Sequence, residues 1–240
     1  MSREPLSVVI LTLNSEKHLG EVLASAAFAD EVLILDSGST DRTLEIAQEA
    51  GCRIEHQAWL GFGRQKQRAV ELATNDWIYV LDSDEVICAD LREEILQTLS
   101  DPAFSAYAVP RLNYFFGKAI RHGGLYPDAT VRLFDRQKAR FTDNAVHEKV
   151  VTDHKIATLH HPMIHYAYDS VEEFIAKQNR YSTLGAKPDR LKALINPLWT
   201  FWRMYVIKQG FRDGWHGYLI ARLYAQYTFW KYVKDLNTDE

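Results

Sequence analysis

The stretch LSVVILTLNSEKHLGEVLASAAFADEVLILDSGSTD, which runs from Leu6 to Asp41, decides the fold class. Its apolar, partly β-branched run Leu6–Leu11 predicts a strand that is buried on both faces, and Glu31–Leu35 predicts a second one. We expect a helix between them that ends near Ala27. A strand, a helix and a strand in this order are typical of a parallel sheet covered by helices.

The same alternation continues over the first hundred residues. We expect a helix that ends near Gly51, a strand over 52–56, a helix over 62–73, a strand over 77–81 and a helix over 90–99. Shorter alternating runs from about Phe104 to Val151 predict mixed strands, and 170–184 predicts a further helix. The predicted class is α/β, with a mostly parallel, Rossmann-like sheet and helices on both faces.

We predict two parts along the chain. Residues 1–186 would form the main domain, which is divided into 1–100 and 101–186. Pro188 marks a break, and 187–240 would form a helical extension that is rich in aromatic and basic residues.

The composition excludes several classes of protein. The 240 residues are 47% hydrophobic and 25% charged, which are globular values. A net charge of −4 argues against a dedicated nucleic-acid binder. Two cysteines argue against a disulfide-rich secreted scaffold. We expect a protein that is made and kept in the cytoplasm.

Polar clusters follow three of the predicted buried strands. They are Thr12-Leu13-Asn14, Asp36-Ser37 and Asp82-Ser83-Asp84-Glu85. Ligands of open α/β sheets bind beyond the carboxyl ends of the strands, so these clusters predict a site at one edge of the sheet. The carboxylates of the third cluster are suitable ligands for Mg²⁺ or Mn²⁺. The alternative is a set of solvated acids that only starts a helix.

Three motifs together resemble the family 2 glycosyltransferases, which have the GT-A fold. They are SVVILTLN (Ser7–Asn14), LDSGSTD (Leu35–Asp41) and WIYVLDSDE (Trp77–Glu85). The resemblance extends to about Tyr181, and it implies that 1–100 is a nucleotide-sugar-binding part and 101–186 an acceptor-binding part. Its later motifs and the aromatic tail are similar to those of bacterial lipopolysaccharide inner-core glucosyltransferases: VRLF (131–134), VHE (146–148) and HY (165–166).

The resemblance implies that Thr12, Asn14 and Asp36 hold the uracil and ribose of a nucleotide sugar, with Ser83 also in the donor site. Many relatives have two acids where this chain has Asp36-Ser37. Asp36 could instead be a turn or cap residue, and for Asp41 we favour the role of a cap.

Two basic residues are further candidates for the donor site. Lys66 would contact the diphosphate, or hold a nearby carboxylate, or lie on a solvated helix face. Arg132 would hold acceptor phosphate, the nucleotide, or only a carboxylate.

The resemblance also implies a metal site and a general base. Asp84 is the first candidate metal ligand. Asp82 is the second, and it would act on the ion directly or through ribose and water. His165 would complete the metal site, or it is a structural residue. The ion would stabilise the charge that grows as UDP leaves. Glu148 is the candidate base for the acceptor hydroxyl, and Asp128 is the runner-up. Glu148 could instead be an ordinary ion-pair partner.

The segment Trp199–Tyr232 contains four of the six tryptophans, with five Lys or Arg residues against one acid. Such a segment is typical of a helix in a membrane interface. The alternative is a soluble helical hairpin that turns at 210–217 and packs on the domain or on a second subunit. We therefore expect peripheral attachment to the cytoplasmic face of the inner membrane.

Together these features predict an inverting, metal-dependent glycosyltransferase. It would move a hexose, in first place glucose from UDP-glucose, to a heptose of the lipid A-linked inner core. Other acceptors remain open: a polyprenyl phosphate, a protein or another glycan. A sugar nucleotidylyltransferase is disfavoured because Thr12–Glu16 lacks the glycine-rich, basic loop of that class. A non-catalytic membrane-associated scaffold is the alternative outside enzymes.

Overall fold

The computed structural model describes residues 3–142 and 149–236, and these form two compact units. Unit 1 comprises Met1–Arg111 and Ala129–His165, and unit 2 comprises Leu112–Asp128 and Tyr166–Glu240. The chain passes from one unit to the other three times: within the strand β7 (Arg111–Phe115), between Asp128 and Ala129, and within the strand β13 (Met163–Tyr168).

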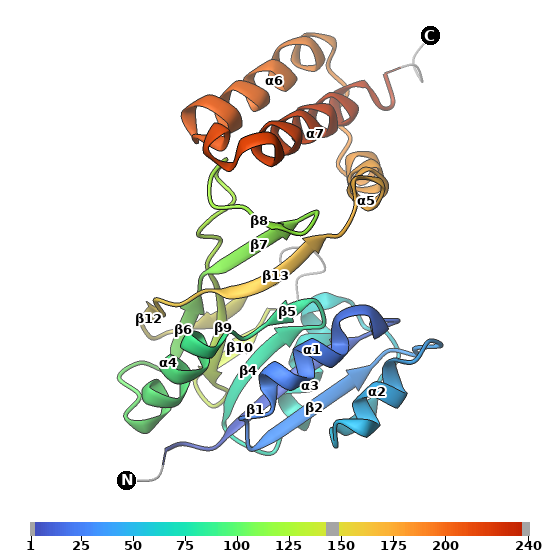
Figure 1. Cartoon of the computed structure of the whole chain (residues 1–240). Helices are drawn as coiled ribbons and strands as arrows, with labels where there is room; N and C mark the ends of the chain where they lie inside the picture. Colours follow the sequence, from blue (N-terminus) through green and yellow to red (C-terminus); the bar gives the residue numbers. More distant parts are fainter. Residues whose placement is uncertain (1–2, 143–148, 237–240) are drawn as a thin grey trace. The chain divides into compact units, whose positions relative to one another are not determined.

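Unit 1 contains a seven-stranded sheet with the strand order β12-β6-β9-β4-β1-β2-β3 (Figure 1). The pairs β4–β1, β1–β2, β2–β3 and β12–β6 are parallel, whereas β9 is antiparallel to both β4 and β6. The strands are β1 (Leu6–Thr12), β2 (Glu31–Asp36), β3 (Arg53–His56), β4 (Trp77–Asp82), β6 (Ala106–Val109), β9 (Thr130–Asp135) and β12 (Ile156–Thr158). This mixed, mostly parallel sheet confirms the predicted class.

Helices lie on both faces of this sheet, as predicted. In Figure 1, α1 (Glu16–Ala26) and α2 (Thr43–Glu49) lie in front of it and α3 (Phe62–Leu72) lies behind. Val9, Leu33 and Val80 pack in one core with Ala69 and Val70 of α3. Side chains alternate along a strand, so the remaining apolar residues of the same strands face the opposite helices. The remaining elements of unit 1 are α4 (Ala89–Ser100), β5 (Glu85–Val86), β10 (Ala139–Phe141) and β11 (Val150–Thr152).

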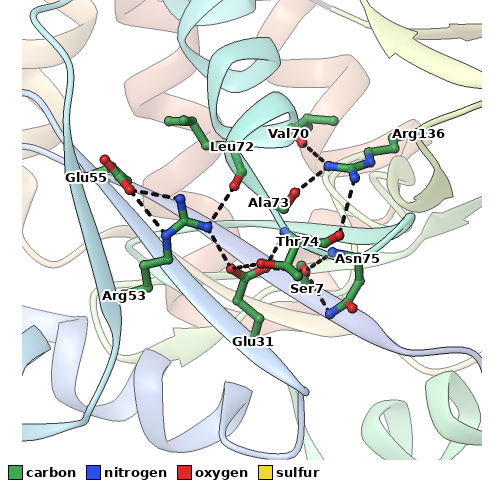
Figure 2. A network of polar contacts seen from close by, with 10 residues as sticks. All are labelled: Ser7, Glu31, Arg53, Glu55, Val70, Leu72, Ala73, Thr74, Asn75 and Arg136. Atoms are coloured by element: carbon green, nitrogen blue, oxygen red, sulfur yellow. Dashed lines mark hydrogen bonds and ion pairs between the residues drawn. The ribbon is translucent and has the colours of Figure 1, made fainter.

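A polar network holds the end of α3 on the first residues of the strands (Figure 2). The Glu31 carboxylate accepts hydrogen bonds from Ser7 Oγ at 2.5 Å, from Thr74 N at 2.7 Å and from Arg53 Nη1 at 3.1 Å. Arg136 donates to the carbonyls of residues 70, 73 and 74, at the carboxyl end of the helix. A cation at this position also suits the helix dipole.

We expect Glu31→Gln to lower the free energy of unfolding by about 1.5–3 kcal/mol at pH 7, because it removes the charged acceptor of these bonds. Burial acts to raise the pKa of Glu31, but the hydrogen bonds from Ser7 and Thr74 outweigh it and the pKa is lowered. A lowered pKa contributes stability above the unfolded value of about 4.3, and this contribution is lost as pH falls through the folded value. The difference in the free energy of unfolding between wild type and variant, measured with urea, should therefore become smaller below about pH 4.

The control for this experiment is Glu93→Gln, which removes the same charge from an exposed helical position. An equal loss of stability in both variants would contradict the role assigned to Glu31. So would a difference in unfolding free energy between wild type and Glu31→Gln that does not change with pH.

Unit 2 combines the hairpin of β7 and β8 (Lys118–Ala119) with the helices α5 (Val171–Leu184), α6 (Arg190–Trp202) and α7 (Gly214–Val233). A π-helix over Arg203–Ile207 and a 3₁₀-helix over Gly210–Asp213 connect α6 to α7. Phe115, Tyr168 and Phe174 share a core with Met204 and Ile220.

This shared core explains why the two units differ from the predicted parts 1–186 and 187–240. Aromatic residues of 112–128 and 166–186 pack with the C-terminal helices, so these segments belong to unit 2. The tail forms the helical hairpin that was one of the two predicted alternatives, with α6 and α7 side by side (Figure 1). Among the described residues, no helix is both long and apolar enough to span a bilayer.

Candidate active site

The carboxyl ends of β4, β1 and β2 lie next to one another at one edge of the sheet of unit 1. In the parallel register Leu11 pairs with Asp82, and Thr12 pairs with Asp36. The three polar clusters that follow these strands therefore meet at one edge, which confirms the placement predicted from the sequence.

Asp36 connects the loops that follow β1 and β2. Its buried carboxylate accepts from Thr12 Oγ1 at 2.9 Å, from Gly38 N at 2.8 Å and from Ser39 N at 2.9 Å. Burial acts to raise the pKa of Asp36, but the bonds from Ser39, Gly38 and Thr12 outweigh it and the pKa is lowered. These contacts match the turn-forming role, and direct contact of Asp36 with a nucleotide stays a prediction.

Asn14 and Asp41 complete the connection between these loops. Asn14 has a positive φ of 51°, accepts from Thr40 N at 2.8 Å and donates its own N–H to Ser39 Oγ at 2.9 Å. Asp41 accepts from Thr43 N and Glu16 N, at the starts of α2 and α1. Asp41 therefore satisfies backbone N–H groups at both helix starts, as expected of a capping side chain, although the N-cap position of α2 is Arg42. The predicted donor-site residues Thr12, Asn14 and Asp36 are brought together, and the bonds between them determine the loop geometry.

A largely buried cluster of charges lies at the end of β4. Arg132 Nη2 is 2.6 Å from Asp82 Oδ2 and 2.5 Å from Glu85 Oε1, and Lys66 Nζ is 3.2 Å from Asp82 Oδ1. Arg111 Nη1 is 3.7 Å from Glu85 Oε1. Lys66 and Arg132 thus hold a carboxylate, which is one of the predicted alternatives, and their contact with a phosphate stays a prediction.

The two acids of this cluster differ in their electrostatics. Burial acts to raise the pKa of Asp82, but the charges of Arg132 and Lys66 outweigh it and hold the pKa well below its ordinary value. Burial raises the pKa of Glu85, whose side chain is fully enclosed. Within the described part of the chain, the buried Nε of Arg132 has no hydrogen-bond partner. Asp82 is therefore favoured as a carboxylate at neutral pH, and two cations hold its position.

Asp84 and His165 form the pair that could bind a divalent cation. The antiparallel pairing of β5 with β13 places His165 opposite Glu85. His165 therefore lies directly beside the acidic turn, by which we mean residues 82–85. His165 Nε2 is 3.6 Å from Asp84 Oδ2, and the Asp84 side chain is 39% exposed. Two neighbouring ligands of an octahedral ion are about 3 Å apart, so the pair fits one ion with little movement.

Among the described residues, no group of three or more His, Cys, Asp or Glu side chains has the geometry of a metal site. Mg²⁺ typically has only one or two carboxylate ligands and keeps waters or substrate phosphates in its other positions. The pair of Asp84 and His165 therefore suits an ion that is shared with a phosphorylated ligand.

A cleft of about 580 Å³ lies beside the charged cluster in unit 1. Its described lining contains four cations, Lys66, Arg111, Arg132 and Lys149, and one acid, Asp82. An excess of positive charge in a concave site attracts anionic ligands. The cleft is therefore suited to a ligand that carries phosphate or carboxylate groups.

Of the three other predicted site residues, Ser83 and Asp128 lie in the described part of the chain. Ser83 is half-buried in the turn between β4 and β5. Asp128 is exposed and belongs to unit 2, after the cis peptide bond between Tyr126 and Pro127. Glu148 lies outside the described residues. The roles of all three stay predictions.

Sequence reasoning missed the parts that Glu85 and Arg111 play in the charged cluster. Glu85 is the last residue of the DSDE motif, and Arg111 is the first residue of a strand with otherwise mostly apolar positions. A charged residue within such a strand is the signal that could have found Arg111, since an enclosed charge needs a partner.

With this geometry described, the family can be stated. The model of the family described as "Glycosyl transferase family 2" matches residues 7–161. The chain belongs to this family and is a glycosyltransferase. The match contains the sheet edge, the charged cluster and the acidic turn.

Individual relatives extend the similarity over almost the whole chain. The lipopolysaccharide core biosynthesis glycosyltransferase LpsC of Rhizobium meliloti is 31% identical over 94% of this chain and 89% of its own. An uncharacterized glycosyltransferase of Rickettsia bellii is 28% identical over 95% of this chain and 85% of its own. A structure of glucosyl-3-phosphoglycerate synthase from Mycobacterium tuberculosis, in complex with Mn²⁺, UDP and glucosyl-3-phosphoglycerate, has a TM-score of 0.43. It is 20% identical and covers 56% of this chain and 57% of its own.

Proposed function

We propose that the protein transfers glucose, with inversion, from UDP-glucose to a heptose of the lipid A-linked lipopolysaccharide inner core. The observation that carries the donor part is the pair of Asp84 and His165, of which Asp84 follows within two residues of Asp82 in the lining of the cationic cleft. The similarity to LpsC, a lipopolysaccharide core biosynthesis enzyme by its name, supports the acceptor part.

The cleft offers suitable chemistry for a nucleotide diphosphate. Charge-assisted hydrogen bonds from Lys or Arg to phosphate are among the strong ones in proteins, and four such cations line the cleft. Mg²⁺ or Mn²⁺ held by Asp84 and His165 would supply positive charge for the leaving diphosphate. Lys66 and Arg132 contribute by keeping Asp82 ionised and correctly oriented.

An inverting transfer also needs a base that accepts the proton of the acceptor hydroxyl. Glu148 is the proposed base, on the strength of the family resemblance of the VHE motif, and Asp128 is the second candidate. Because the proposed acceptor is part of a lipid, we also propose that the enzyme works at the cytoplasmic face of the inner membrane, attached peripherally.

The test is a transfer assay with Mn²⁺ and a matched panel of donors and acceptors. UDP-glucose, UDP-galactose and GDP-mannose would each be offered with heptose-terminated lipid A core and with polyprenyl phosphate. We expect mass spectrometry to find one added hexose on the heptose-terminated core, and only with UDP-glucose. A product formed on polyprenyl phosphate alone would replace the proposed acceptor, and a product formed from GDP-mannose alone would replace the proposed donor.

A further inference from the structure

The helix α6 of unit 2 has a continuous apolar face that is exposed. Leu191, Leu194, Leu198 and Trp202 are between 49% and 72% exposed, and Ile195 is 53% exposed. Exposure of this degree is normal for single apolar residues, but with Trp199 six such residues occur on one helix of 13 residues.

The spacing places these side chains on one side of the helix. Positions 191, 194, 195, 198 and 202 follow the i, i+3, i+4, i+7, i+11 pattern of a single helical stripe. The opposite side of α6 is used within unit 2. There Ala193 is buried, and Thr200 Oγ1 is 3.2 Å from Thr228 Oγ1 of α7. The exposed stripe is therefore a second apolar face, separate from the one that packs on α7.

Cations border this stripe on both sides. Arg190 and Lys192 precede and follow Leu191, and Arg203 follows Trp202. Successive residues are about 100° apart around a helix, so Arg190 lies on one side of the stripe and the other two lie on the opposite side. Between residues 187 and 212 there are six Lys or Arg residues and one acid, Asp189.

From this arrangement we infer that the stripe of α6 is the surface by which the protein binds a bilayer that contains anionic lipid. Leucines would enter the acyl boundary, Trp202 would lie at headgroup depth and the bordering cations would meet lipid phosphates. The charge pattern favours an anionic lipid surface over a second copy of the chain, because two such basic stripes would repel each other.

This inference deepens the membrane attachment proposed above and assigns it to particular residues. The sequence pointed to Trp199–Tyr232, but Tyr205 and Tyr224 of that segment pack against the core of unit 2. The stripe begins eight residues earlier, at Leu191, and continues along α6.

The experiment is co-sedimentation of the full chain with vesicles that contain no saccharide acceptor. One set is phosphatidylethanolamine with about a third phosphatidylglycerol, and the other is phosphatidylcholine alone. We expect binding to the anionic vesicles that weakens with salt, and little binding to the neutral ones. Leu198→Glu should weaken partitioning at least tenfold, because it removes one leucine that would enter the acyl boundary and adds a charge of the wrong sign. The matched control Ile175→Glu, on the exposed side of α5, should bind like wild type.

A second set of variants separates position from net charge. Arg190→Gln/Lys192→Gln/Arg203→Gln should weaken binding about a hundredfold, at about fivefold for each cation. Lys17→Gln/Arg68→Gln/Arg92→Gln removes the same charge from exposed helical positions of unit 1 and should have little effect.

Three outcomes would overturn the inference. In the first, the wild type does not bind anionic vesicles, and in the second, Leu198→Glu binds them like wild type. In the third, sedimentation velocity shows that the wild type is a dimer and that Leu198→Glu dissociates it. The last would make the stripe a contact between copies. Sugar transfer to a detergent-dispersed acceptor would still report on the proposed function in each case, so failure of the two proposals can be distinguished.

Discussion

Asp84→Asn is expected to lower hexose transfer about a thousandfold, since a bound cation supplies several kcal/mol of charge stabilisation in the transition state. The change keeps the size of the side chain but removes the charge that the ion needs. Fold stability should stay close to wild type because the Asp84 side chain is 39% exposed and lies outside the buried cluster of Asp82, Glu85 and Arg132.

Calorimetry with UDP, in the presence and absence of Mn²⁺, measures the same effect without turnover. In wild type Mn²⁺ should tighten UDP binding, and in Asp84→Asn this gain should disappear. Asp90→Asn, which is the same change at an exposed carboxylate a few residues away, is the control and should behave like wild type. Full transfer by Asp84→Asn would remove Asp84 from the metal site.

Gly217→Ala is expected to destabilise unit 2 by on the order of 3 kcal/mol. A Cβ at position 217 would overlap the carbonyl oxygen of Gly210 and would lie 2.8 Å from its carbonyl carbon. Both atoms belong to the backbone, so the clash cannot be relieved by turning a side chain. The first turn of α7 would have to move away from the 3₁₀-helix before it, and thermal unfolding followed by circular dichroism should show a lower midpoint.

Gly20→Ala provides the opposite expectation for the same substitution. Gly20 lies in the helix α1, and a Cβ added there would meet no atom within 4 Å. Alanine should therefore stabilise the protein by about 0.5–1 kcal/mol, since it lowers the entropy lost on folding. If Gly217→Ala changed the unfolding midpoint by the same amount and in the same direction as Gly20→Ala, the close approach of Gly217 to Gly210 would be without importance for stability.

The sequence was sufficient for much of the fold because the relevant signals are local. The run Leu6–Leu11 is apolar at nearly every position because β1 is buried on both faces, and the same holds for β4. Each of these strands ends at a polar residue, and parallel strands end at the same edge. Fold class and the edge that holds the site could therefore be predicted together.

The division into units could not be predicted, because it depends on which aromatic residues share a core. Phe115 and Phe174 are far apart in the chain and show no local sign of packing together. Which side of α6 is exposed could not be predicted from the sequence for a related reason. A helix with apolar residues on more than one side does not reveal by itself which side its partner will cover.

The sequence by itself determined the residue types of the site, namely the acids Asp82, Asp84 and Glu85 at the end of a buried strand, and a basic residue at position 66. Only the tertiary structure decided how these groups pair. Arg132 reaches Asp82 through the antiparallel pairing of β9 with β4, and His165 reaches Asp84 through the pairing of β13 with β5. Strand pairing joins residues 50 and 81 positions apart, and no local pattern encodes which distant strand will supply the partner of a given charge.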